Sequence, residues 1–546
     1  MNALPKCAKF YITTPIYYVN ADPHIGHLYT SLIADAAQRW QQLIRPNVKI
    51  TFATGTDEHG SKIQQAALKN NMAVDKYCDQ ISSSYKAMSA NFNVGYTSFI
   101  RTTDEAHMKT VQEFWKTLSK NGYIYSSKYS GWYCVSDETF LSESQLKETV
   151  NSNGERTLVS LESGHPVEWT EEQNYMFTLS KFQKELMKWL SKNDGVVKPK
   201  KYQKILWDMI SNEELADVSI SRPSSRVHWG VKVPGDDTQT VYVWLDALVN
   251  YLTVAGYPDI ESETFNNIWP PEVQVIGKDI IKFHGIYWPS FLLAANLELP
   301  KTLFCHSHWT VDDEKMSKSK NNVVSPFNRS LLYTCDGLRY FLLREGVAHS
   351  DGNYSDTKLT RILNSELADT LGNLLSRCCS SALNPNQVFP EIDSEAFERV
   401  ASMDVTKKIM DAVMKLPEIC EQHYSDLNFY KVVDATIATL HVTNLFFESI
   451  KPWELRKKPE SMDQLNVVLH LTLETLRICS IILSPIIPSI SDRILNKMSV
   501  PKSRRLWKEV RSQSWNDPSF KQVKLSTSTA VIFQRILDER KKNSRL

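Results

Sequence analysis

The chain has 546 residues, 42% apolar and 23% charged, and is too rich in core-forming side chains for a disordered or fibrous protein. Its length predicts about three or four domains. With 63 lysines and arginines against 62 acids, the net charge of +1 excludes a uniformly basic nucleic-acid coat, so any polyanion must be bound by local positive regions.

The cysteines and the apolar segments indicate the kind of cellular compartment in which the protein works. Nine cysteines, an odd number scattered along the chain, do not resemble a disulfide framework and favour a reducing environment. The longest apolar run near the carboxyl terminus, residues 478–490, is broken by Pro485 and Pro488 and falls short of the roughly 20 residues that a spanning helix needs. We therefore expect a soluble protein with no membrane partner.

The N-terminal segment predicts a βαβ unit. Residues 10–14 indicate a short buried strand, residues 24–43 place apolar side chains at helical spacing, and residues 48–53 alternate as a second strand. Such a unit predicts a doubly wound, Rossmann-type parallel sheet with ligands at the carboxyl ends of its strands.

The amino-acid composition of the chain then changes at two positions. From about residue 123 the sequence is rich in aromatic and turn residues, and strand-like segments return only at 240–245 and 273–276, so we predict that an insertion splits the sheet. After about residue 359 glycine nearly vanishes, and leucine-rich helical patterns predict an α-helical bundle.

Two basic motifs indicate the chemistry. His24 and His27 lie three residues apart after the first strand, on one face of a helix's first turn, where backbone N–H groups favour an anion. Gly26 lets a flat ligand approach the backbone. Far along the chain, Lys315 and Lys318 stand in the stretch Lys-Met-Ser-Lys-Ser. Alone, the histidines also fit a helix cap or core and the lysines a solvated loop; together they predict a polyphosphate site.

These motifs resemble those of class I aminoacyl-tRNA synthetases, and the match extends to the methionyl-tRNA synthetase family over essentially the whole chain. The other segments that carry the resemblance are TPIYYVN at 14–20, TGTDEHG at 54–60, YVWLDA at 242–247, IGKDI at 276–280, Phe-His at 283–284, LGN at 371–373 and KPWE at 451–454. The domains it implies are a catalytic domain in two halves (1–122 and 236–305), a connective insertion (123–235), a lysine-loop and stem-contact region (306–358), an anticodon-binding helical domain (359–520) and a tail (521–546) whose last residues fray.

The resemblance implies ATP-dependent activation of L-methionine. The methionine carboxylate would attack the α-phosphorus of ATP, pyrophosphate would leave, and the methionyl group would pass to the terminal adenosine of tRNA(Met). The residues implied to bind ATP are His24, Gly26, His27, Gly277, Asp279, Lys315 and Lys318, of which the histidines and lysines are also catalytic, with Mg²⁺ sharing the neutralisation of phosphate charge. Gly277 and Asp279 also fit a turn glycine with a solvated aspartate.

A methionine pocket needs an acid for the ammonium and apolar walls for the thioether. Asp57 matches the family position that pairs with the α-amino group. The positions that match the side-chain walls are Ile16, Tyr18, Trp244, Ala247, Tyr251, Ile280, His284 and Trp288. Aromatic residues at such spacing also fill cores. Leu248 stands where the family pattern allows proline, which puts the wall there in doubt.

Many relatives carry cysteine knuckles in the insertion. Here Cys134 and the remote His165 are too few ligands for a tetrahedral site, so we predict no structural zinc, which elemental analysis would check. The insertion is also smaller than the editing insertions of other class I enzymes.

In the helical region Asn373 and Arg377 share a helix face, and Trp453 offers a flat ring to an unstacked base. The resemblance implies that these three residues read the CAU anticodon. Basic clusters at residues 198–204 and 504–505 fit further tRNA contacts or a solvated surface equally.

The sequence of the insertion, which lacks the zinc-binding cysteines, resembles that of mitochondrial and related bacterial-type enzymes. We therefore expect a mitochondrial matrix enzyme, with a cytosolic bacterial enzyme as the alternative. By analogy we expect a monomer.

Three rival functions remain open: another class I synthetase, a small-molecule nucleotidylyltransferase, and a non-catalytic tRNA-binding relative. The helical C-terminal region disfavours the second, and the intact histidines and lysines disfavour the third.

Overall fold

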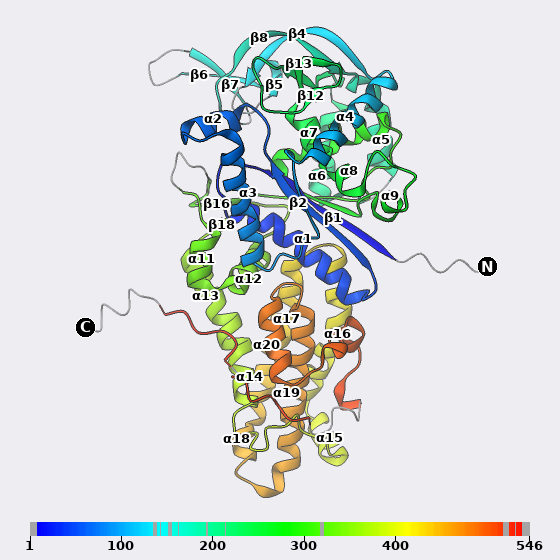
Figure 1. Ribbon diagram of the computed structural model, residues 1–546. Coiled ribbons are helices and arrows are strands. Elements are labelled where there is room, and N and C mark those ends of the chain that lie inside the picture. Colours follow the sequence, from blue (N-terminus) through cyan, green and yellow to red (C-terminus); the bar gives the residue numbers. More distant parts are fainter. Residues whose placement is uncertain are drawn as a thin grey trace, which may run out of the picture.

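A six-stranded parallel sheet organises the first part of the chain (Figure 1). Its order is β3-β2-β1-β14-β15-β9, and all neighbours run parallel. The strands are β1 (Lys9–Tyr18), β2 (Lys49–Asp57), β3 (Ser98–Arg101), β9 (Val197–Lys198), β14 (Val273–Gly277) and β15 (Leu303–His306). The computed structural model describes residues 8–134, 139–141, 143–150, 156–161, 163–192, 195–212, 214–316, 322–516, 523–529 and 531–537.

Helices cover both faces of this sheet because β1 alternates between two apolar cores. Tyr11 packs into one core and Ile12 into the other. The Ile12 core includes side chains of α1 (Ile25–Ile44), α2 (Ser61–Lys69) and α3 (Val74–Asn91), and the Tyr11 core includes those of α4 (Glu105–Lys120), α6 (Lys200–Ser211), α8 (Asn250–Ala255), α9 (Glu263–Ile268) and α10 (Trp288–Ala294). Strands that are apolar on both faces are typical of buried parallel sheets, so the predicted doubly wound fold is confirmed.

The strand order reverses between β1 and β14. The chain proceeds outward from β1 to β2 and β3 on one side, and from β14 to β15 on the other. In such sheets the ligand crevice lies outside the carboxyl ends of the strands at this switch point. The predicted βαβ unit forms one flank of the crevice, because residues 10–14 lie in β1, residues 24–43 match α1, and residues 48–53 overlap β2.

The inserted segment forms small antiparallel sheets at one end of the molecule (Figure 1). One has the order β10-β8-β4-β5, one β11-β13-β12, and one pairs β6 with β7. Their bounds are β4 (Ile124–Cys134), β5 (Thr139–Leu141), β6 (Leu146–Val150), β7 (Arg156–Ser160), β8 (Glu168–Phe177), β10 (Val218–Ser219), β11 (Ser221–Pro223), β12 (Lys232–Val233) and β13 (Asp236–Val241), and α5 (Gln183–Lys192) follows β8.

Two features of this region differ from the sequence prediction. Strand β9, within the range expected for the insertion, pairs with β15 at the edge of the main sheet. Residues 240–245 are not one strand of that sheet: β13 belongs to a small sheet, and the helix α7 (Val243–Leu248) begins two residues after it. A short apolar run does not by itself distinguish strand from helix.

A small sheet and two helices connect the main sheet to the helical domain. The sheet has the order β17-β16-β18, with bounds β16 (Trp309–Val311), β17 (Glu314–Lys315) and β18 (Gly352–Tyr354), and the helices are α11 (Pro326–Tyr333) and α12 (Cys335–Glu345). Fully buried Arg339 on α12 donates to Asp35 on α1 at 2.7 Å and to the carbonyl oxygen of Ile486 at 2.9 Å. The helix that begins with the two histidines is therefore anchored to the helical domain.

The last part of the chain is the predicted helical bundle (Figure 1). Its elements are α13 (Asp356–Ile362), the π-helical η6 (Leu363–Gly372), α14 (Asn373–Cys378), α15 (Ser394–Ala401), α16 (Asp404–Ser425), α17 (Phe429–Ile450), α18 (Pro452–Leu455), α19 (Met462–Leu483) and α20 (Pro488–Lys497). Among the described residues one helix, Pro459–Leu483, is long and apolar enough to cross a membrane, and 94% of its most apolar stretch is buried inside the protein. A core helix of a bundle has these properties.

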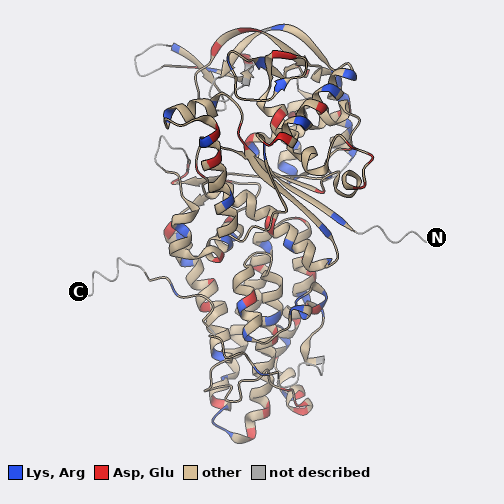
Figure 2. Cartoon of the chain, in the orientation of Figure 1, with Lys and Arg blue, Asp and Glu red and all other residues tan. Residues whose placement is uncertain are grey.

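Part of the predicted tail is packed against the bundle. Ile532 and Phe533 are buried, and the backbone N–H of Ile536 donates to Asn364 on η6 at 2.8 Å. The residues expected to fray, 540–545, lie outside the described residues. Figure 2 shows both signs of charge interspersed over the two parts of the molecule, in keeping with the near-zero net charge.

Candidate active site

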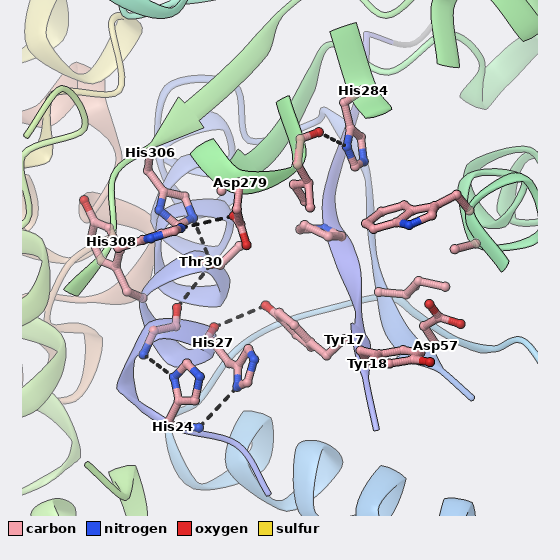
Figure 3. Close-up of a pocket in the computed structure, with 18 of the residues that line it drawn as sticks. Tyr17, Tyr18, His24, His27, Thr30, Asp57, Asp279, His284, His306 and His308 are labelled. Atoms are coloured by element: carbon pink, nitrogen blue, oxygen red, sulfur yellow. Dashed lines mark hydrogen bonds and ion pairs between the residues drawn. The ribbon is translucent and has the colours of Figure 1, made fainter. Parts of the chain in front are cut away.

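His24 and His27 cap the start of α1 at the crevice (Figure 3). His24 is the N-cap residue, and its Nδ1 accepts the backbone N–H of Gly26 at 3.0 Å. In return, Nδ1 of His27 accepts the backbone N–H of His24 at 3.2 Å, and the two rings stack with centroids 3.9 Å apart. Because each Nδ1 is an acceptor, each neutral ring carries its proton on Nε2.

Burial keeps both imidazoles neutral. Loss of solvation, together with nearby His308, lowers the pKa of His24 to about 4. Burial beside His24 holds the pKa of His27 well below its ordinary value. At neutral pH each ring therefore offers an Nε2–H donor without a positive charge. The cap, one of the alternatives for these residues, is present and fixes the tautomer.

Gly26 has a steric reason to be glycine. A Cβ at this position would lie 2.8 Å from Cε1 of His24, so any side chain would displace the capping ring. Gly277 is similar, because its Cβ would lie 2.5 Å from a carboxylate oxygen of Asp279. Both glycines allow a polar side chain to fold back over the backbone.

The predicted ATP and methionine residues meet around one cavity of about 380 Å³ at the switch point. The lining residues from the ATP set are His24, Gly26, His27, Gly277 and Asp279. Those from the methionine set are Ile16, Tyr18, Asp57, Trp244, Ala247, Tyr251, Ile280 and His284. A cavity of this size lies in the range of small-molecule sites. Segments up to 268 residues apart thus form one site.

The acidic end of the cavity lies at the carboxyl ends of β1 and β2. Asp57 is the last residue of β2 and is paired in register with Tyr18, the last residue of β1. The exposed fraction of Asp57 is 8%, so its charge is poorly screened by water. A poorly exposed carboxylate at the end of a strand beside Tyr18 is suited to bind an ammonium group.

A buried chain of hydrogen bonds fixes the part of the cavity wall that contains His284 and Tyr251. Nδ1–H of His284 donates to the carbonyl oxygen of Ile280 at 3.1 Å, and Nε2 accepts the hydroxyl of Tyr251 at 2.8 Å. Burial lowers the pKa of His284 to about 4, so the ring is neutral. The indole of Trp244 stacks on Phe283 with centroids 3.5 Å apart. This wall is therefore rigid, uncharged and aromatic.

Of the residues predicted to form the methionine pocket, Trp288 is the one that does not line the cavity. It is fully buried behind Tyr251, with ring centroids 5.8 Å apart, and does not line the cavity. The prediction that Trp288 lines the pocket is wrong, because α10 packs its ring into the Tyr11 core instead. Leu248, which departs from the family pattern, does line the cavity.

Sequence reasoning missed several lining residues. His306 ends β15, His308 lies two residues after it, and Thr30 lies one turn beyond His27 on α1. The hydroxyl of Thr30 lies 2.9 Å from Nε2 of His306, and Nε2 of His308 lies 3.1 Å from a carboxylate oxygen of Asp279. The signal that could have found them was the repeated histidine at the carboxyl end of a buried strand, where ligands bind in such sheets.

The lysine loop starts next to the histidines. Lys315 ends β17, and the following residue, Met316, lines the cavity. The methyl carbon of Met316 lies 3.8 Å from the position that a Cβ on Gly26 would take. Lys318 lies outside the described residues. The described start of the second basic motif, residues 315–316, therefore lies beside the first one.

Comparisons with known proteins agree over nearly the whole chain. Residues 10–379 match the family model described as "tRNA synthetases class I (M)", and residues 400–545 match "Anticodon binding domain of methionyl tRNA ligase". The chain belongs to the methionyl-tRNA synthetase family.

Two curated relatives and a solved structure extend this match. The human mitochondrial methionine–tRNA ligase is 44% identical over 97% of this chain and 91% of its own length, and a probable mitochondrial ligase of Schizosaccharomyces pombe is 40% identical over 91% of each. The methionyl-tRNA synthetase of Mycobacterium tuberculosis in complex with methionyl-adenylate aligns with a TM-score of 0.89 and 34% identity over 97% of this chain and 100% of its own. Similarity to the mitochondrial ligases supports the predicted mitochondrial location.

The residues expected to read an anticodon in this methionyl-tRNA synthetase lie together on the bundle. Asn373 is exposed at the start of α14. The guanidinium of Arg377, on the same helix, lies 5.4 Å from the ring centroid of half-buried Trp453 and 4.6 Å from that of Phe447, and pairs with Glu448 at 2.6 Å. Arg377 is thus in contact with Trp453, and Asn373 lies one turn earlier on the helix of Arg377.

The two basic clusters are partly neutralised in this synthetase. Lys198 pairs with Asp426 at 3.1 Å, and Arg505 pairs with Asp492 at 2.6 Å. Surface pairs of this kind weaken the local positive potential that a polyanion would meet. The evidence for tRNA binding therefore lies with the bundle rather than with these clusters.

Histidine, cysteine and acidic side chains are spread through the part of the chain that the structure describes. Within it, no three His, Cys, Asp or Glu side chains gather as a metal site, and Cys134 is a free, buried thiol. The absence of structural zinc from this synthetase stays a prediction, since residues 135–138 lie outside the described ranges.

Proposed function

We propose that the cavity at the β1–β14 switch point activates L-methionine with ATP and that the helical domain presents tRNA(Met) to it. The single observation that supports this most strongly is the meeting of two neutral histidine donors, a poorly exposed carboxylate and an aromatic wall around one cavity. ATP binding is expected for the family, and the related solved complex holds methionyl-adenylate.

In the first step the methionine carboxylate attacks the α-phosphorus, and the bond to the bridging oxygen of pyrophosphate breaks. Negative charge grows on the leaving phosphates. Nε2–H groups of His24 and His27 donate to these oxygens, and the ammonium groups of Lys315 and Lys318 neutralise them. A well-placed donor of this kind contributes about 3 to 4 kcal/mol to the transition state. The step needs positioning and charge stabilisation, without a covalent bond to the protein.

Mg²⁺ fits this site as a complex with the triphosphate. The ion prefers to keep waters and to bind through phosphate oxygens with one or two carboxylates, and Asp279 is the carboxylate on the nucleotide side of the cavity. When bound, the ion would add further charge neutralisation on the phosphates. Gly277 and Asp279 would position the ribose.

Methionine selection follows from the two ends of the cavity. Asp57 pairs with the α-ammonium, which places the carboxylate toward the nucleotide. The thioether lies against the aromatic wall, where a sulfur–aromatic contact gains about 0.3 to 1.5 kcal/mol. The neutral His284–Tyr251 pair gives this wall a polar contact without a charge. β-Branched amino acids would be excluded by shape.

In the second step the 2′-hydroxyl of the terminal adenosine attacks the adenylate carbonyl, and AMP leaves. The helical domain, which we assign to residues 359–520, holds the anticodon through Asn373, Arg377 and Trp453. An arginine stacked on two rings is a flat, cationic platform of the kind that single-stranded bases stack on.

ATP–pyrophosphate exchange with each of the twenty amino acids tests the activation step. Methionine alone is expected to support exchange, and charging of tRNA(Met) should follow. Exchange with a different amino acid would assign the chain to another class I specificity. No exchange, with retained tRNA binding, would favour the non-catalytic relative.

Lys318→Ala is expected to lower the rate of methionine activation by about 10², because it removes one charged donor to the leaving phosphates. The affinity for methionine should change little, since this lysine does not contact the amino acid in the proposed arrangement. Single-turnover exchange and methionine titration measure the two quantities. Lys320→Ala, a matched charge change in the same stretch, should keep the rate; lost methionine affinity with an unchanged rate in Lys318→Ala would contradict the assignment.

Trp453→Ala is expected to weaken charging of tRNA(Met) by about 10- to 100-fold, the loss of one base-stacking contact of roughly 1 to 3 kcal/mol. Methionine-dependent exchange should keep its wild-type rate, because the ring lies on the bundle. Trp453→Phe retains a ring and should recover most of the charging. Equal losses in both assays would indicate a folding defect and not an anticodon contact.

A further inference from the structure

A buried ionic cluster joins the two walls of the proposed methionine pocket. Asp246 on α7 is 1% exposed and accepts a hydrogen bond at each carboxylate oxygen. Nδ1 of His59 lies 2.6 Å from Oδ2, and Nε2 of His107 lies 2.9 Å from Oδ1. Both imidazoles are buried as well, with exposed fractions of 4% and 0%.

Two of the three residues come from segments that also line the pocket. His59 lies two residues after Asp57, the proposed ammonium-binding residue. Asp246 lies on α7 between Trp244 and Ala247, both of which line the same cavity as Asp57. The His59–Asp246 contact therefore joins the segment that follows Asp57 to the helix that carries these two lining residues.

His107 extends the cluster to the next helix. Its Nδ1 lies 3.0 Å from the hydroxyl oxygen of Thr253 on α8, the helix that also carries Tyr251 of the pocket wall. His107 itself belongs to α4, which packs against both α7 and α8. One carboxylate thus fixes α7, α8 and the loop after β2 relative to one another.

The carboxylate is ionised in this environment. Burial alone would raise the pKa of Asp246, but the imidazoles of His59 and His107 outweigh that effect and lower the pKa to about 2. A buried carboxylate is stable only when its oxygens are hydrogen-bonded, so loss of either donor is costly. Such a cluster resists changes in the spacing of the elements that it joins.

The same loop has a second anchor that does not reach the far wall. Glu58 receives two hydrogen bonds from Arg101 on β3, at 2.7 and 2.9 Å. That pair holds the loop to the neighbouring strand of the sheet, whereas the His59 contact crosses to α7. The two anchors therefore have separate consequences for the pocket.

We propose that Asp246 is a positioning residue: with His59 and His107 it holds the ammonium-binding Asp57 and the thioether-binding wall at a fixed separation, and so sets which side-chain length the pocket accepts. This inference rests on the proposed function. Neither imidazole nor the carboxylate lines the cavity, so the effect is transmitted through backbone placement.

Asp246→Asn is the direct test in the full-length enzyme. The amide cannot accept two imidazole donors, so one contact is replaced by opposed N–H groups. In pyrophosphate exchange, KM for methionine is expected to rise about tenfold while KM for ATP stays near wild type. Ethionine is one methylene longer than methionine. The ratio of kcat/KM for methionine to that for ethionine should decrease in the variant.

A pair of variants at His59 separates the hydrogen bond from packing. Asparagine places an amide N–H near the position of Nδ1, so His59→Asn should recover most of the methionine affinity that His59→Leu loses. Because these variants keep the charge on Asp246, they test the proposal even where Asp246→Asn fails to fold.

Glu474→Gln is the matched control, since it breaks another buried pair, with Arg477 at 2.7 Å, inside α19. It should lower Tm and leave both KM values unchanged. The proposal is overturned when folded Asp246→Asn retains its methionine KM and ethionine discrimination, or when Glu474→Gln reproduces its kinetic defect. A wild-type enzyme without methionine-dependent exchange would instead refute the proposed function.

Discussion

Replacing His24 by asparagine is expected to slow methionine-dependent pyrophosphate exchange by about 10²- to 10³-fold, the usual loss for one preorganised transition-state donor. The side-chain oxygen of asparagine can still accept the N–H of Gly26, since asparagine is among the best N-cap residues. The variant loses the Nε2–H that would donate to the phosphates in the proposed arrangement. Stopped-flow or steady-state exchange measures the rate, and thermal unfolding measures the cap.

His24→Ala provides the comparison. It removes the donor and the cap together, so the same kinetic defect should be joined by a loss of about 0.5 to 2 kcal/mol in the free energy of unfolding. A full exchange rate in His24→Asn would show that the imidazole acts only as a cap.

Asp57→Asn is expected to lower kcat/KM for methionine by about 10²- to 10³-fold, because it leaves a poorly solvated ammonium without its partner. The change is nearly isosteric, so the walls of the cavity should keep their shape. KM for ATP should stay near its wild-type value, since the residue lies at the amino end of the site.

The substrate side supplies the control for this prediction. 4-(Methylthio)butanoate lacks the amino group and should compete only weakly for the wild-type pocket. If Asp57 acts on the ammonium, the inhibition constant of this analogue should be the same for wild type and Asp57→Asn. A further loss of analogue affinity in the variant would mean that the carboxylate shapes the pocket instead.

Local patterns predicted the first half of the fold well. The βαβ unit could be predicted because β1, α1 and β2 each show the periodicity of their own structure within a continuous segment. Residues 240–245 could not be assigned in the same way, because that apolar run ends one strand and starts a helix whose partners lie far away in sequence. Strand β9 is two residues long and carries no periodic signal at all.

The site was predictable to the extent that family motifs mark it. His24, Asp57 and His284 lie around the cavity as expected. Trp288 did not follow, because its large ring is accommodated in the core behind Tyr251. Asp246 contacts His59 and His107, which lie 187 and 139 positions earlier in the chain. Tertiary packing sets these contacts, and no local sequence pattern predicts them.

The reciprocal capping of His24 and His27 has a consequence for how the site can work. To become an imidazolium, either ring would need a proton on the nitrogen that already receives a helix N–H. Neither ring can therefore relay protons during turnover, and both behave as fixed dipoles aimed by the first turn of α1. Variation in acidity across the physiological range should thus leave their part of the reaction unchanged.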